Sequence, residues 1–156
     1  MFTSQSLRAV VKPGSVAFGE HRLDDVVHQI DVRGTLGDEA GRELGRRVES
    51  ALAGGVRWLI LDVGEAIDVS DRVLEGLVSA AGALRARRGE LIVAGASRSV
   101  TERLAAYDVA HRPAVAASVD QAVMILKMLR PKTDIRPAQR AKQRISSLTL
   151  PRIEPT

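Results

Sequence analysis

Two nearly unbroken apolar runs, VRWLILDV at residues 56–63 and ELIVAG at residues 90–95, constrain the fold more than any other feature. A strand with one face in water alternates apolar and polar residues, and these runs do not alternate, so they are typical of strands covered on both faces. The segment between them, residues 70–88, carries one apolar stripe at helical spacing. Strand, helix and strand in this order predict an α/β fold with right-handed crossovers.

Strand and helix signals also alternate in the rest of the chain. Residues 26–34 alternate as a strand does, and a shorter strand signal at 15–19 precedes them. SVTE at 99–102 and SVDQ at 118–121 are capping boxes that mark helix starts. The other expected elements are a helix over 38–53, a helix from 99 to about 106, a strand over 113–117 and a helix over 118–129. Because two strands precede any helix, we expect a small mixed sheet with one antiparallel edge and about four helices.

Charge divides the 156-residue chain into three expected segments: a flexible N-terminus over 1–12, one domain over 13–130 and a basic, Pro-containing tail over 131–156. From Arg130 onward seven basic residues face two acidic ones, a surplus of +5 that leaves the rest at −1 of the net +4. We expect an extended or partly disordered tail, which either only solubilises the protein or binds phosphate or an acidic partner.

The sequence offers little for catalysis. The three histidines are scattered, and Ser70 lacks the flanking glycines of a nucleophile elbow. Asp62 ends a central strand as a phospho-accepting aspartate does, but the acidic pair and the lysine that such sites need are not evident. With no cysteine and no phosphate-binding glycine loop, we expect a non-enzyme without a metal or cofactor. No signal peptide or membrane span is evident, so we expect a cytoplasmic protein without direct membrane insertion.

Several motifs resemble the STAS domain family (sulphate transporter and anti-sigma factor antagonist) over roughly residues 15–129. The motifs that carry the resemblance are VRGTLG, ALAGGVRWLILDV, RARRGELIVAGAS, SVTERLAAYDV and ASVDQAVMIL, in the order of the family. The resemblance implies a small mixed sheet with helices packed against it, which agrees with the pattern of residues. It also implies reversible protein–protein binding as the function.

In that family a serine in a segment like IDSSGLG is phosphorylated by a partner kinase. Aligned without gaps from Leu61-Asp62-Val63, the pattern places Ser70 on the family's aspartate, and Asp71 and Arg72 on its two hydroxyl positions. Asp71 would then replace the regulated serine with a permanent charge. A shifted register, which needs two extra residues before RRGE, instead places Ser70 on the second hydroxyl.

A plainer interpretation of Ser70 and Asp71 is structural. The N-terminus of a helix has unpaired N–H groups and a positive dipole end, so Ser70 can cap it and Asp71 can complement it. Arg72 can pair with Asp71 or face a partner. Gly37 and Tyr107-Asp108 also depart from the family pattern, which weakens the expectation of a kinase-driven switch.

The resemblance implies a partner-binding surface around residues 68–76. The residues expected to contact a partner, besides Ser70, Asp71 and Arg72, are Asp68, Val69, Val73, Glu75 and Gly76. Implied partners are a serine-kinase/anti-sigma factor or other STAS-domain proteins, including a homo-oligomer. Two alternatives remain open: an accessory subunit of a membrane lipid-transport ATPase, or a nucleotide- or nucleic-acid-binding module using the tail. We expect no specific nucleic-acid ligand, because the body lacks clustered aromatics for stacking.

Overall fold

The computed structural model of the protein describes residues 15–130. The elements in order are β1 (Val16–Asp24), β2 (Val27–Thr35), α2 (Asp38–Ala53), β3 (Trp58–Ile67), α3 (Asp71–Arg85), β4 (Glu90–Ala94), α4 (Arg98–Ala105), β5 (Ala114–Ala116) and α5 (Val119–Leu129). By its internal contacts the chain divides into two units, Met1–Leu126 and Lys127–Thr156. The predictions for segments 1–12 and 131–156 lie outside the described residues.

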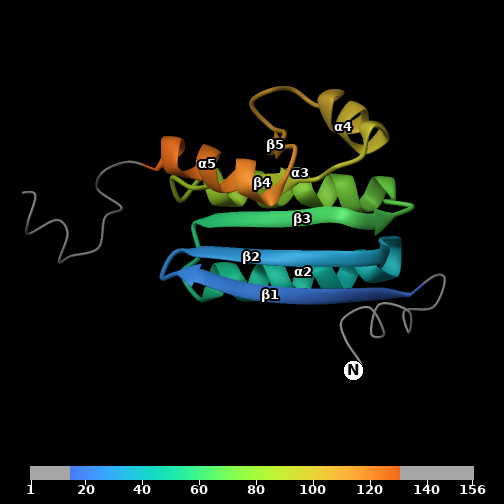
Figure 1. The fold of residues 1–156 in the computed structure, drawn as a ribbon, viewed down its shortest axis with the longest axis horizontal. Coiled ribbons are helices and arrows are strands. Elements are labelled where there is room, and N and C mark those ends of the chain that lie inside the picture. The colour runs from blue at the N-terminus through green and yellow to red at the C-terminus, as the bar shows by residue number, and fades with distance from the viewer. Residues whose placement is uncertain (1–14, 131–156) are drawn as a thin grey trace, which may run out of the picture. The chain divides into compact units, whose positions relative to one another are not determined.

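The five strands form one sheet in the order β1-β2-β3-β4-β5 (Figure 1). β1 pairs antiparallel with β2, and the pairs β2–β3, β3–β4 and β4–β5 are parallel. The predicted mixed sheet with an antiparallel edge is therefore confirmed, as is the α/β class. Each helix after β2, β3 and β4 crosses over to the next strand.

The larger core lies on the face of the sheet that α2 and α3 cover. Leu59 and Leu61 of β3 are at most 1% exposed there, and Leu44 of α2 and Leu77 of α3 pack in the same cluster. The predicted apolar stripes of both helices therefore face the sheet. This packing places α2 and α3 side by side.

A smaller core lies on the opposite face. Trp58 and Ile60 of β3 are 3% and 0% exposed, and they share a cluster with Ala122 and Leu126 of α5. Side chains of β3 thus alternate between two buried clusters, as the unbroken run at 56–63 predicts.

Several boundaries differ from the sequence-based expectation, among them the end of α3 at Arg85 rather than near residue 88. β1 continues to Asp24 rather than ending near residue 19, because its polar half still pairs with β2. β3 continues to Ile67 beyond a register shift, and its last residues pair with the end of β2. Ser97, not Ser99, caps α4: its hydroxyl accepts from the Val100 N–H at 3.1 Å, which leaves Val100 facing the core.

Gly89 lies where the end of α3 meets the start of β3, and a side chain there has no room. A Cβ at Gly89 would overlap the Arg57 carbonyl, which accepts a backbone hydrogen bond from Glu90 at 3.0 Å. We expect Gly89→Ala to lower the free energy of unfolding by about 2–3 kcal/mol, since backbone must move. Gly82→Ala, in open space on α3, should instead raise it by about 0.5–1 kcal/mol through helix propensity. Urea titration of both variants checks this, and equal effects would contradict the packing at Gly89.

Glu20 connects β1 to α2 and should make stability depend on pH. Hydrogen bonds from His28, at 2.9 Å, and from Arg47 hold the pKa of Glu20 below its ordinary value of 4.5. A lowered folded-state pKa adds stability above pH 4.5, and this is lost as pH falls through the folded-state pKa. Glu20→Gln should therefore cost up to about 1 kcal/mol at pH 7, and this cost should shrink below pH 4.5.

The measurement is thermal unfolding of both proteins between pH 7 and pH 3. Glu75→Gln is the control, because Glu75 is exposed and makes no ion pair with the residues described. A cost of Glu20→Gln that stays constant over this range would contradict the assignment.

Candidate functional site

The candidate site lies at the edge of the sheet where β2, β3 and β4 end. Parallel strands end at the same edge, so the loops that lead into α2, α3 and α4 gather there, as in other α/β sheets. Two backbone hydrogen bonds connect the first two loops: Leu36 N–H to the Ile67 carbonyl at 2.9 Å, and Ser70 N–H to the Leu36 carbonyl at 3.1 Å. The segment before α3 is thus held in place from β2.

Asp68 turns the chain between β3 and α3. Its φ of 52° lies in the left-handed region, which aspartate adopts more readily than most residues. After this turn Val69 packs against the larger core, and Asp68 is exposed. The turn fixes the direction in which α3 begins.

Ser70 is the N-cap of α3. Its backbone is extended, and its hydroxyl accepts a hydrogen bond from the Val73 N–H at 3.2 Å. The side chain is half-buried. The structure therefore shows the capping role that the sequence allows for Ser70.

Asp71 is the first residue of α3, and its side chain is 87% exposed. Arg103 of α4 donates a hydrogen bond to the Asp71 carboxylate at 2.7 Å. Such an exposed pair contributes little to stability, about 0–1 kcal/mol. The contact places the carboxylate beside the positive end of the helix dipole.

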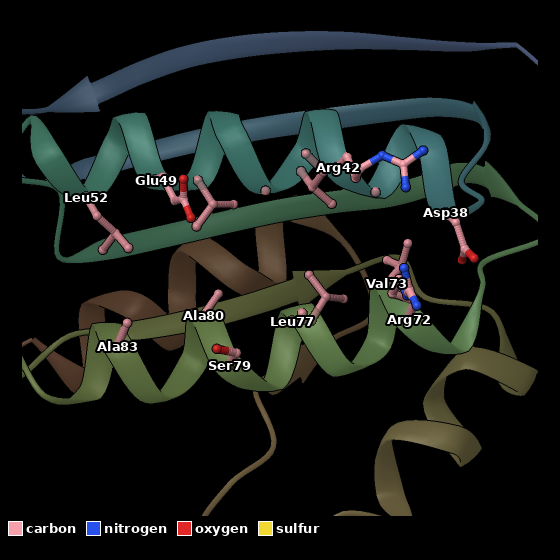
Figure 2. A pocket seen from close by; sticks show the side chains of 15 residues that line it. Asp38, Arg42, Glu49, Leu52, Arg72, Val73, Leu77, Ser79, Ala80 and Ala83 are labelled. Carbon is pink, nitrogen blue, oxygen red and sulfur yellow. The ribbon is translucent and has the colours of Figure 1, made fainter.

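Arg72 does not pair with Asp71, so the first of the two alternatives left open by the sequence is wrong, and contact with a partner stays a prediction. Within the described part of the chain Arg72 forms no ion pair, and its exposed side chain lines a groove between α2 and α3. Arg42 and Asp38 of α2 lie at the same end of this groove (Figure 2).

The other residues expected to contact a partner differ in exposure. Asp68, Glu75 and Gly76 are exposed, and Val69 is half-buried. Val73 is only 4% exposed and packs against Gly41 of α2, so it lies beneath the surface rather than on it.

Sequence reasoning missed two residues of this surface. Arg103 is 32 positions from Asp71, and no local pattern connects the two. Ile67 is 55% exposed at the end of β3, next to Asp68. The apolar end of the β3 run was a signal for Ile67, but the strand was expected to stop at residue 63.

No group of three or more His, Asp or Glu side chains within residues 15–130 could hold a metal ion. The three histidines contact different carboxylates: His21 contacts Asp31 at 2.8 Å, His28 contacts Glu20 at 2.9 Å and His111 contacts Asp108 at 3.7 Å. Over the same residues, no helix is long and apolar enough to cross a bilayer.

Solved structures with the same fold include several anti-sigma factor antagonists. The antagonist SpoIIAA in its unphosphorylated form is 16% identical, with a TM-score of 0.59 over 71% of this chain and 98% of that one. An antagonist from Mycobacterium paratuberculosis is 15% identical, with a TM-score of 0.62 over 76% and 99%. A form of RsbS from Moorella thermoacetica is 17% identical, with a TM-score of 0.60 over 72% and 96%.

No family model matches the sequence. No curated protein matches it either. At these identities the likeness establishes the fold, and the resemblance to STAS domains is confirmed at that level.

The capping role of Ser70 can be measured against a second cap of the same kind. Ser97 caps α4 with the same geometry, accepting from the residue three positions on. We expect Ser70→Ala and Ser97→Ala each to lower the free energy of unfolding by about 1 kcal/mol, because each leaves one N–H group without its partner. Chemical unfolding provides the values. A neutral Ser70→Ala beside a costly Ser97→Ala would contradict the cap at Ser70.

Proposed function

We propose that this protein is a non-catalytic regulatory module that works by binding another protein through the surface at the start of α3. The observation that carries the proposal is the Asp71 carboxylate, which is exposed at the first position of α3 and held by Arg103. The shared fold supports it, since the structural neighbours are anti-sigma factor antagonists.

Regulation in this proposal rests on a built-in charge. SpoIIAA is a neighbour that has been solved both with and without phosphate. In the ungapped alignment Asp71 takes a hydroxyl position of the family motif. A phosphate adds a charge of about −1.5 to −2 that a phosphatase can remove, whereas Asp71 carries one permanent charge.

The partner we propose is a serine-kinase/anti-sigma factor or another STAS-domain protein. Its contact surface would combine Ile67 as an apolar anchor with the polar groups of Asp68, Asp71 and Glu75. An apolar side chain with charged neighbours is a common arrangement at protein interfaces.

The test compares Asp71→Asn with wild type. A partner is first captured with the tagged full-length chain from its native host, and its affinity is then measured by calorimetry. Asparagine keeps the shape and removes the charge, so we expect a change of about 0.3–2 kcal/mol in binding free energy. Asp120→Asn is the matched control, because Asp120 is an exposed acid in the first turn of α5.

Mass spectrometry of the protein from its own cells provides the second readout. We expect no phosphate on Ser70, whose hydroxyl is occupied as a cap. Substantial phosphate on Ser70 would support the shifted register instead. Equal affinities of wild type and Asp71→Asn would show that the Asp71 charge does not contribute to the interface.

A further inference from the structure

A groove of about 400 Å³ runs between α2 and α3 (Figure 2). The two helices start at the same edge of the sheet and run side by side, with the strands behind them. Much of the lining is apolar and small, including Gly41, Gly45, Gly76, Ala80 and Ala83. A Cβ added at Gly45 or Gly76 would meet no atom within 4 Å. The groove is therefore open enough for the backbone of another helix to approach closely.

The lining residues of both helices repeat at the spacing of a helix–helix seam. The outermost of them on α2 are Asp38, Arg42, Gly45, Glu49 and Leu52, and on α3 Arg72, Gly76, Ser79 and Ala83; more buried residues of both helices, such as Leu44 and Leu77, form the floor. Steps of four and three residues keep one stripe facing a partner helix along its whole length. The adjacent stripe of α2, with Leu44 and Val48, is buried against the sheet. The exposed stripe thus forms a second contact face of α2.

Charges on the α2 stripe complement each other when the helix meets a reversed copy of itself. Arg42 and Glu49 are exposed, and neither forms an ion pair with a residue in the described range. They lie on either side of Gly45. In an antiparallel pair of α2 helices centred near Gly45, Arg42 of each copy faces Glu49 of the other. A parallel pair would place like charges together.

The two-fold axis that relates such a pair of α2 helices also allows the two copies of α3 to pack on each other. Gly41 lies opposite Val73, since a Cβ at Gly41 would come within 2.7 Å of the Val73 Cγ2. The level of Gly45 on α2 therefore corresponds to that of Leu77 on α3. Around this level Gly76 of one copy meets Ser79 of the other, and both side chains are small. No bulky or like-charged pair is forced on α3.

The geometry points to a second copy of this chain as the partner that covers the groove, with the two grooves facing each other. Helices α2 and α3 of each copy pack antiparallel on those of the other, as a four-helix arrangement with a two-fold axis near Gly45. Two reciprocal Arg42–Glu49 ion pairs set the register. Asp71 does not line the groove, whereas Arg72 and Gly76 do, so this contact adjoins the proposed surface at the start of α3 without including Asp71.

The mass of the full-length chain by sedimentation velocity tests the dimer. We expect wild type to sediment as a dimer at micromolar concentration. Arg42→Glu and Glu49→Arg should each raise the dissociation constant by about tenfold or more, because each places like charges opposite one another. The double variant restores opposite charges in the swapped order, so it should recover the wild-type constant. Gly45→Leu should also favour monomers, while its open surroundings allow it to fold.

Two controls separate the groove from general effects. Arg98→Glu reverses an exposed charge on α4, and Gly82→Leu adds the same bulk to α3 outside the groove. Both should leave the dimer unchanged, as should Asp71→Asn. A monomeric wild type, or a double variant no better than the single ones, would overturn the proposal. A loss of partner affinity in Asp71→Asn with an intact dimer would support the proposed function. It would neither support nor contradict the dimer.

Discussion

Burial of β3 on both faces is the constraint on which the rest of the structure depends. Its backbone pairs with β2 on one side and β4 on the other, so its polar groups are satisfied without water. Its side chains then need cover above and below. Leu59 and Leu61 require α2 and α3, whereas Trp58 and Ile60 require α5.

The position of the candidate site follows from that cover. Parallel neighbours of β3 can be joined only by crossovers, and right-handed crossovers bring α2 and α3 onto the same face. Both helices then begin at the same edge of the sheet. The proposed surface at the start of α3 and the groove between α2 and α3 are therefore neighbours, because the strand order places both helix starts at one edge. Arg72, which follows Asp71 in the chain, already faces the groove.

The sequence predicted the elements well where one physical signal dominated. The runs at 56–63 and 90–95 are typical of buried strands, and the apolar stripe of α3 favours packing against the sheet. Prediction failed where two local choices were nearly equal. Ser97 and Ser99 are both good caps, and only the tertiary burial of Val100 selects Ser97. The Asp71–Arg103 contact could not be predicted, because strand order, not sequence spacing, brings α4 beside α3.

Trp58, the single tryptophan of the chain, has a practical consequence that follows from its place in the smaller core. Its indole contacts the side of the sheet that α5 covers, while most of the helical backbone lies elsewhere. Fluorescence excited selectively at tryptophan therefore reports on the α5 face, and circular dichroism reports mainly on helices of the opposite face. An experimenter can thus compare the two sides of the sheet by two optical signals without attaching any dye.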